Sequence, residues 1–260
     1  MSIFEFDGEK YKKSSTHQKE WGNKIIAGLN LEGGERALDL GCGDGTLTRK
    51  IYSLLPRGSV VGIDASDGMI NTTKSLESEN LSFYRLDINE MNYFEEFDLI
   101  FSNATLHWIK DHKKLLSNCY KALKSGGYIR FNFAGDGNCS NFYKVIKEVM
   151  SEERYRQFFK KFEWPWYMPD PGDYKNLLSG CEFKEIKIWK ENADRYFNNK
   201  DEMIGWIDQP SIVPFLGLID DENKITFRNE VVEKMVKETI QSDGKCFETF
   251  RRINVFAEKG

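Results

Sequence analysis

No stretch of this sequence stays apolar for the roughly 18 residues that a membrane-spanning helix needs. The opening segment, MSIFEFDGEKYKK, has neither the apolar core of a secretion signal nor the arginine-rich pattern of an organelle presequence. We therefore expect a cytoplasmic protein with no membrane partner. An excess of basic charge is missing as well, because 37 lysines and arginines stand against 41 aspartates and glutamates. The formal charge of −4 gives no positive field for a nucleic acid, so we expect no nucleic-acid partner.

Cysteine is scarce, and the five cysteines form no Cys-x-x-Cys pair. This pattern excludes a zinc knuckle and a disulfide framework and is typical of reduced thiols. Neither a Ser/His/Asp arrangement nor a set of residues with metal-ligand spacing stands out, so we expect no metal. The sequence leaves the oligomeric state open, with a monomer as the default expectation. The cysteines are Cys42, Cys119, Cys139, Cys181 and Cys246.

What the first half of the chain does have is short apolar runs that alternate with helical patterns. This alternation is typical of βαβ units on a parallel sheet. Apolar residues at helical spacing in 21–29 predict a helix ahead of the sheet, packed near its ligand-binding edge. The helix predicted at 111–124 should stop at Gly126 and Gly127. Strands are predicted at 36–41, 59–65, 81–88, 97–104 and 127–133.

After Ala134 the pattern changes to a helix and then to an aromatic loop broken by prolines. Alternation returns in EFKEIKIWK and CFETFRRINVFAEK, residues 182–190 and 246–259, which we predict as the last two of seven strands. Aromatic insertions on either side of the first of these strands predict a cap over the carboxyl edge of the sheet. The aromatic residues expected to exclude water there are Trp164, Trp166, Tyr167, Trp189 and Trp206.

The motif ALDLGCGDGTLT places Gly41, Gly43 and Gly45 at alternate positions directly after an apolar strand. Such glycines forfeit side-chain packing, which indicates a backbone that a ligand must approach closely. Thr46 stands where a dinucleotide fingerprint has its third glycine, and this argues against a nicotinamide dehydrogenase. No lysine follows the loop as in a nucleotide-triphosphate site. The loop therefore predicts a ligand site at the carboxyl ends of the strands.

Together with VVGIDAS, YRLDI and FDLIFSNATLHWI, in this order, the motif resembles the class I S-adenosylmethionine-dependent methyltransferases. The resemblance covers about 37–134 well and the remainder loosely. It implies an α/β fold with a Rossmann-like, doubly wound, seven-stranded, mostly parallel sheet and a helical, aromatic-rich cap. It also implies the cofactor S-adenosyl-L-methionine and the product S-adenosyl-L-homocysteine.

The same resemblance assigns roles to residues. In the family the glycine loop passes under the methionine part of the cofactor, an acid ending the second strand binds the ribose, and an acid after the third strand reaches the adenine. Here these acids are Asp64 and Asp87, and carboxylates suit a cationic ligand with hydroxyl and amino donors. The predicted cofactor-binding residues are Tyr11, Asp39, Gly41, Cys42, Gly43, Asp64, Ala65, Met69, Asp87, Ile88 and Asn103.

The residue pattern together with the resemblance predicts how the chain is divided. An N-terminal helical segment over the cofactor site is expected at 1–35. The methyltransferase core is expected at 36–138 and 181–260, with cap insertions at 139–180 and 198–220.

The segment FSNATLHWIKDH, at the end of the fourth strand, resembles three carboxylate-methylating groups of the family. These are the trans-aconitate, juvenile hormone acid and malonyl carrier-protein methyltransferases. The spacing Tyr-x-x-x-Ser-x-x-Gln of Tyr11, Ser15 and Gln18 is similar to a segment upstream of the glycine loop in such enzymes. The resemblance therefore places Gln18, His107 and Trp108 on the acceptor side as candidate catalytic residues.

The predicted function is methylation of a small molecule, with a carboxylate as the leading acceptor. A carboxylate is already ionised at neutral pH and needs no general base. An amine or hydroxyl acceptor would need one, and His107 is the candidate. A protein that binds the cofactor without catalysis is the remaining alternative. Arg195, Arg251 and Arg252 are considered as anchors for an anionic acceptor, against the simpler interpretation that they are surface charges.

Overall fold

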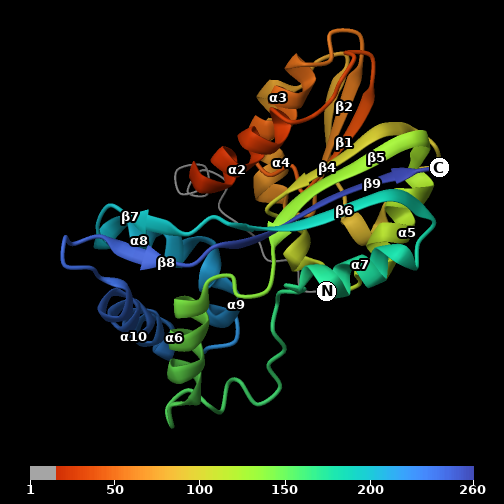
Figure 1. The fold of residues 1–260 in the computed structure, drawn as a ribbon. Coiled ribbons are helices and arrows are strands. Elements are labelled where there is room, and N and C mark those ends of the chain that lie inside the picture. The colour runs from red at the N-terminus through yellow and green to blue at the C-terminus, as the bar shows by residue number, and fades with distance from the viewer. Residues whose placement is uncertain (1–15) are drawn as a thin grey trace. The chain divides into compact units, whose positions relative to one another are not determined.

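The computed structural model describes residues 16–260, and its main sheet has seven strands in the order β3-β2-β1-β4-β5-β9-β6 (Figure 1). Strands β1 to β5 run parallel, and β9 pairs antiparallel with β5. The predicted doubly wound, mostly parallel sheet is therefore confirmed. The strands are β1 (Arg36–Leu40), β2 (Ser59–Asp64), β3 (Leu81–Arg85), β4 (Phe97–Asn103), β5 (Leu123–Ala134), β6 (Phe183–Asn192) and β9 (Arg251–Lys259).

Helices cover both faces of this sheet because successive side chains of a strand point to opposite faces. Ala37 and Leu99 pack on one face with apolar residues of α2 and α3. Leu38 and Ile100 pack on the other face with apolar residues of α5 and α7. No helix in the described range 16–260 combines the length and the apolar character needed to cross a membrane. These helices are α2 (Thr16–Ile26), α3 (Thr46–Ser53), α4 (Asp67–Thr73), α5 (His112–Ala122) and α7 (Pro171–Ser179).

Two predicted element boundaries are wrong. Helix α5 ends at Ala122 rather than at the glycine pair, because β5 already begins at Leu123. Gly126, with φ of +76°, sits where the pairing of β4 with β5 shifts register, so the glycine serves an irregular strand and not a helix end. The last predicted strand is also split, since 246–248 forms a separate strand and only 251–259 joins the main sheet.

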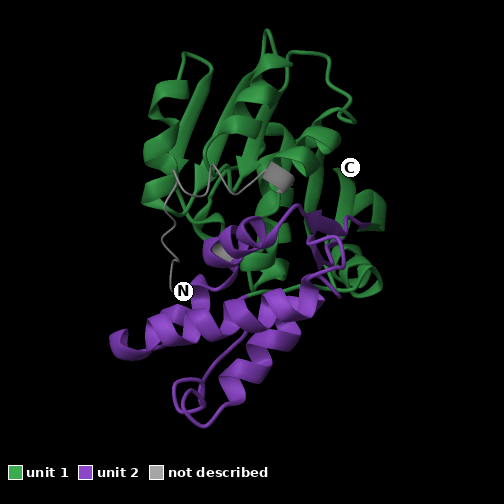
Figure 2. Ribbon diagram, turned by 90° about the vertical axis from the view of Figure 1, so that its left-hand side faces the viewer, with its two compact units in different colours: residues 1–136, 166–191, 252–260 green, residues 137–165, 192–251 purple. Residues whose placement is uncertain are grey.

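The chain divides into two compact units (Figure 2). Unit 1 comprises residues 1–136, 166–191 and 252–260 and holds the main sheet, while unit 2 comprises 137–165 and 192–251. The bounds of unit 2 differ from those of the predicted cap insertions. Residues 166–180, predicted as cap, belong to unit 1, and residues 221–251, predicted as core, belong to unit 2. Its elements are α6 (Ser140–Ser151), β7 (Arg195–Phe197), α8 (Lys200–Trp206), α9 (Val213–Leu216), α10 (Asp221–Thr239) and β8 (Cys246–Glu248).

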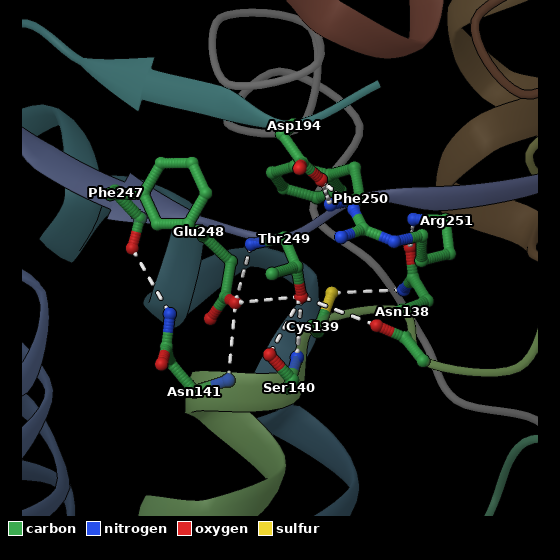
Figure 3. A network of polar contacts seen from close by, with 11 residues as sticks. Asn138, Cys139, Ser140, Asn141, Asp194, Phe247, Glu248, Thr249, Phe250 and Arg251 are labelled. Atoms are coloured by element: carbon green, nitrogen blue, oxygen red, sulfur yellow. Dashed lines mark hydrogen bonds and ion pairs between the residues drawn. The ribbon is translucent and has the colours of Figure 1, made fainter. Parts of the chain in front are cut away.

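A buried carboxylate organises the centre of unit 2 (Figure 3). Glu248 is fully buried and accepts hydrogen bonds from the main-chain N–H groups of Asn141, Phe142 and Thr249, at 3.2, 2.9 and 2.7 Å. The first two of these groups lie in the first turn of α6, where N–H groups have no partner within the helix. Glu248 thus supplies the missing cap and joins β8 to α6.

Candidate functional site

The glycine loop leaves β1 and is tied to the end of β2. The N–H groups of Gly41 and Cys42 donate to the carbonyl oxygen of Ile63 at 2.8 and 3.0 Å. The N–H of Gly43 donates to Oδ2 of Asp64 at 3.0 Å. Two predicted cofactor residues, Gly43 and Asp64, therefore touch each other at the carboxyl ends of neighbouring strands.

The backbone at Gly41 and Gly43 is in the left-handed region, with φ of +72° and +54°. The surroundings of the two glycines differ. A Cβ atom on Gly41 would lie 2.1 Å from the side chain of Thr105, so this glycine allows two segments to approach. A Cβ on Gly43 would meet no protein atom within 4 Å. The space beside Gly43 is thus open, and its use by a ligand stays a prediction.

Asp39 and Cys42, two further predicted cofactor residues, have buried side chains. Asp39 is 2% exposed, and its Oδ2 accepts a hydrogen bond from Oγ1 of Thr48 at 2.7 Å. Burial raises the pKa of Asp39 to about 7, although the bond from Thr48 opposes this shift. Burial also raises the pKa of the Cys42 thiol well above its ordinary value. Asp39 therefore links β1 to α3, and Cys42 is a neutral thiol.

Asp64 and Asp87 end or follow their strands as predicted, and each also orders the turn that comes next. Oδ1 of Asp64 accepts from the N–H of Ser66 at 3.0 Å, just before α4. Oδ1 of Asp87 accepts from the main chain and the side chain of Asn89, at 2.8 Å in both cases. Three other predicted cofactor residues lie beside these turns: Met69 and Ile88 are buried, and Ala65 is half-buried.

The turn after β4 brings a strained residue to the site. Ala104 has φ of +58°, a conformation that costs a residue with a Cβ atom about 1 to 2 kcal/mol. Its N–H donates to the carbonyl oxygen of Asn132 at 2.7 Å, and the hydroxyl of Thr105 donates to the carbonyl oxygen of Gly41 at 3.1 Å. The strain is thus held in place by contacts to β5 and to the glycine loop.

Helix α2 lies against the same edge, as the sequence predicts. Nδ2 of Asn103 donates to the carbonyl oxygen of Gln18 at 2.8 Å, and Nζ of Lys19 lies 2.8 Å from Oδ2 of Asp44 in the glycine loop. Burial alone would raise the pKa of Asp44, but the bond from Lys19 and those from Thr46 lower it. Tyr11 and Ser15, predicted to belong to the same segment, lie outside the described residues.

Among the described residues, 16–260, no hydrogen-bond partner is found for three buried polar atoms at this edge. They are Oε1 of Gln18, Oδ1 of Asn103 and Nδ1 of His107. A buried polar atom left without a partner costs about 1 to 3 kcal/mol, so each of these three atoms is a candidate contact for a ligand. All three residues were predicted from the sequence to face the cofactor or the acceptor.

His107 and Trp108 lie in the short turn after β4, Leu106–Trp108. His107 as a whole residue is half-buried, its Nδ1 is fully buried, and its ring centroid lies 5.5 Å from that of Trp108. Burial, the charge of Arg252 and the nearby His112 hold the pKa of His107 well below its ordinary value. His107 is therefore a neutral imidazole at neutral pH.

Arg252 is the functional candidate that the sequence identifies least well. Residue pattern alone does not separate it from its neighbour Arg251, yet Arg252 is 3% exposed while Arg251 is half-buried and paired with Asp194. The interpretation of Arg252 as a surface charge is therefore wrong. Its partner Asn132, on β5, carried no recognisable signal in the sequence.

The five predicted cap aromatics do not form one group. Trp164 and Trp206 belong to unit 2, where Trp164 stacks on Tyr143 at 4.7 Å. Trp166 lies in unit 1, 5.6 Å from Trp108, and Tyr167 lies in unit 1 against His112. Trp189, on β6, is 42% exposed. Aromatic composition alone does not say which unit a side chain joins.

Known proteins resemble this chain both in sequence and in fold. A family described as a methyltransferase domain matches residues 31–201. The chain belongs to this methyltransferase family. Trans-aconitate 2-methyltransferase of Rhodococcus jostii is 25% identical to it, over 97% of this chain and 99% of that protein. An uncharacterized methyltransferase of Schizosaccharomyces pombe is 28% identical, over 98% of each chain.

Solved structures of low sequence identity share the fold of this methyltransferase. The YcgJ protein of Bacillus subtilis superposes with a TM-score of 0.61 at 16% identity, over 94% of this chain and 98% of that one. Phosphoethanolamine N-methyltransferase 2 of Haemonchus contortus, in complex with S-adenosyl-L-methionine, superposes with a TM-score of 0.56 at 20% identity. The match covers 96% of this chain and 58% of that one. The protein is a class I methyltransferase that uses S-adenosyl-L-methionine.

Proposed function

We propose that this methyltransferase transfers the methyl group to a carboxylate of a small organic acid and forms a methyl ester. The observation that carries the proposal is the state of His107, a neutral imidazole of lowered pKa whose Nδ1 is buried near the Arg252 charge. Such an imidazole is a weak base for an amine or a hydroxyl. An acceptor that is already ionised fits this environment better. The curated relatives named trans-aconitate 2-methyltransferase support the same class of acceptor.

The residues at the edge of the sheet fit the cofactor. Oε1 of Gln18 and Oδ1 of Asn103 find no donor among the described residues, and an ammonium group such as the one the cofactor carries would supply donors to both. Gly43 leaves open space beside the loop. We assign Asp64 to the ribose hydroxyls and Asp87 to the adenine amino group, with Met69 and Ile88 as the apolar wall. Asp39 acts from behind the loop by fixing α3 to β1.

When bound, S-adenosyl-L-methionine would supply a methyl group on a sulfonium: an O–C bond to the acceptor carboxylate would form as the C–S bond breaks, S-adenosyl-L-homocysteine would be the leaving group, and no proton would be gained or lost. The chain itself then has to position the acceptor and exclude water from it. His107 donates a hydrogen bond that orients the carboxylate, and Trp108 forms the wall behind it. Helix α2, held by Asn103 and Asp44, covers this side of the site.

The test is turnover of the purified protein with a panel of carboxylic acids, amines and alcohols. We expect S-adenosyl-L-homocysteine to form with acids and the product to be a methyl ester that mild alkali hydrolyses. Methylation of amines or alcohols while every acid stays unreacted would contradict the proposal and return His107 to the role of a base.

A further inference from the structure

We propose that His112 is a positioning residue for methyl transfer, which holds the turn Leu106–Trp108 in the geometry that lets His107 and Trp108 align the acceptor. The role deepens the proposed function and rests on it for one point, the place of His107 and Trp108 beside the acceptor. His112 itself needs no contact with the acceptor or the cofactor.

The turn Leu106–Trp108 does not fix its own position. It is a single turn of 3₁₀-helix, a class of helix whose hydrogen bonds have poor geometry. Two backbone hydrogen bonds of 2.9 Å close it, and both stay within residues 105–109. Contacts with other elements of unit 1 therefore decide where His107 and Trp108 point.

His112, the first residue of α5, provides one of these contacts. Its Nε2 lies 2.9 Å from the carbonyl oxygen of Leu106 and donates to it, because a carbonyl oxygen only accepts. The next carbonyl oxygen, that of His107, accepts the N–H of Tyr167 at 2.7 Å. The ring centroids of Tyr167 and His112 lie 4.6 Å apart. Two successive carbonyls of the turn are thus held by two residues that pack on each other.

The ring of His112 is itself held in place. It is buried, its Nδ1 lies 2.9 Å from the hydroxyl oxygen of Tyr174 on α7, and the ring of Phe133 on β5 lies 5.5 Å away. Burial lowers the pKa of His112, so the ring carries one proton, which Nε2 uses, and Nδ1 accepts from Tyr174. A polar ring is costly to bury unless its nitrogens find partners, so packing alone would favour an apolar side chain here. A buried polar network whose members are all paired specifies one arrangement.

The two histidines near the end of β4 differ in what their nitrogens meet. Nδ1 of His107 finds no hydrogen-bond partner among residues 16–260, whereas both ring nitrogens of His112 have one. The structure therefore gives His107 the geometry of a residue that contacts a ligand and His112 the geometry of its support. The sequence motif contains both and does not distinguish them.

A support of this kind acts on alignment. A misplacement of about 1 Å can lower a rate by about a hundredfold, so loss of the bond from His112 should lower kcat. The affinity for the cofactor should change little, because the glycine loop has bonds of its own to β2: the N–H groups of Gly41 and Cys42 donate to the carbonyl oxygen of Ile63.

The kinetic test compares His112→Leu, which removes the donor, with His112→Gln, whose amide can place an N–H where Nε2 stood. Leu116→Ala, a buried residue one turn further along α5, is the matched control for lost packing. With an acceptor that the wild type methylates, at a temperature where all proteins are folded, we expect kcat to fall by about tenfold or more in His112→Leu. His112→Gln should recover most of this loss. Leu116→Ala should lower the melting temperature and keep kcat.

The affinity for S-adenosyl-L-homocysteine, measured by calorimetric titration, should stay within about twofold of wild type in all three variants. Wild-type kcat in folded His112→Leu would overturn the inference. An equal loss of kcat in all three variants would overturn it as well, because the histidine would then contribute only to packing.

A measurement without turnover separates the inference from the proposed function. Nitrogen-15 NMR of the protein loaded with S-adenosyl-L-homocysteine shows which nitrogen of each of the three histidines carries the proton. We expect Nε2 for His112. The indole N–H signal of Trp108, assigned through Trp108→Phe, should shift in His112→Leu and stay in place in Leu116→Ala.

A proton on Nδ1 of His112 in wild type would overturn the inference, and this result stands if His112→Leu fails to fold. An unmoved indole signal in folded His112→Leu would also overturn it. The expected spectra without methylation of any carboxylic acid would keep the support of the turn by His112 and remove the proposed function.

Discussion

Gly41 and Gly43 share a left-handed backbone but differ in what a side chain would meet, and this gives a matched pair of variants. Gly41→Ala should destabilise the protein without any ligand, because its Cβ would overlap Thr105. Gly43→Ala should cost about 1 kcal/mol of stability from its φ alone, and in addition weaken S-adenosyl-L-methionine binding. Thermal unfolding without cofactor and calorimetric titration check both statements. Equal melting temperatures with equal affinities would show that the open space beside Gly43 serves no ligand.

The lowered pKa of His107 fixes the expected pH dependence of turnover. Burial and Arg252 disfavour the protonated ring, so His107 titrates below pH 6.5 and is already neutral above it. With a carboxylic acid as acceptor, the rate should be flat from about pH 6.5 to 8 in wild type and in His107→Ala. The variant should lose rate only modestly, whereas Trp108→Ala should lose more because it misplaces the acceptor.

The measurement is a pH–rate profile of all three proteins at saturating cofactor. A base of ordinary pKa would instead make the wild-type rate rise between about pH 6 and 8. A rise that disappears in His107→Ala would show that the ring accepts a proton during the reaction.

Helix α5 is anchored at its first residue by a neutral histidine. Nε2 of His112 lies 2.9 Å from the carbonyl oxygen of Leu106 and must donate to it, so Nδ1 accepts from the hydroxyl of Tyr174 at 2.9 Å. Burial lowers the pKa of His112 to about 4, more than the bonds to backbone carbonyls raise it. The unfolded chain binds this proton below about pH 6.5 and the folded chain does not, so stability falls as the pH falls.

The free energy of unfolding should therefore drop by about 2 to 3 kcal/mol between pH 7 and 4.5 through His112 alone. Denaturant unfolding of wild type and His112→Gln at both pH values isolates this part. The subtraction removes other groups, including Asp39, whose raised pKa acts in the opposite direction. The same pH loss in both proteins would show that His112 is not the group responsible.

Helices and strands whose apolar residues recur at a regular spacing were predictable from the sequence, but the residues at which these elements end were not. The apolar runs of β1, β2 and β4 and the glycine loop after β1 follow directly from residue pattern. The end of α5 does not follow from this pattern, because residues 123–125, ahead of the glycine pair, carry no helix-breaking side chain and Leu123 leaves the helix to pair with Phe97 of β4. At 246–259 the alternation continues through Thr249 and Phe250, where the structure separates two sheets. Long-range pairing decided both cases, and no local pattern records it.

The candidate site shows the same limit. Asp64, Asp87 and Asn103 were predicted because each stands at a strand end in a known motif. The burial of Arg252 depends on Asn132 and Trp21, which are 120 and 231 residues away in the sequence. An Arg-Arg pair on a strand gives no indication of which member turns inward.

At the scale of the whole molecule, the described residues assigned to the cofactor all lie in unit 1. A lesion confined to unit 2 should then spare cofactor binding. Glu248→Ala removes the acceptor for three N–H groups and should destabilise unit 2 by several kcal/mol. The affinity for S-adenosyl-L-homocysteine should stay within about twofold of wild type at a temperature where unit 1 is folded.

Calorimetric titration together with a thermal scan makes this measurement, and Ser151→Ala, at the exposed end of α6, is the matched control. A parallel collapse of cofactor affinity in Glu248→Ala would mean that the two units unfold as one.

A methyl donor is an electrophile, and the loop assigned to it carries a sulfur atom of its own. Sulfur attacks electrophiles as the thiolate and hardly at all as the thiol. Because burial and the neighbouring carboxylates Asp64 and Asp39 keep Cys42 protonated far into the alkaline range, the enzyme does not offer its cofactor a rival nucleophile. If the loop binds the methyl donor as we propose, we expect these aspartates also to limit alkylation of the protein by its own cofactor.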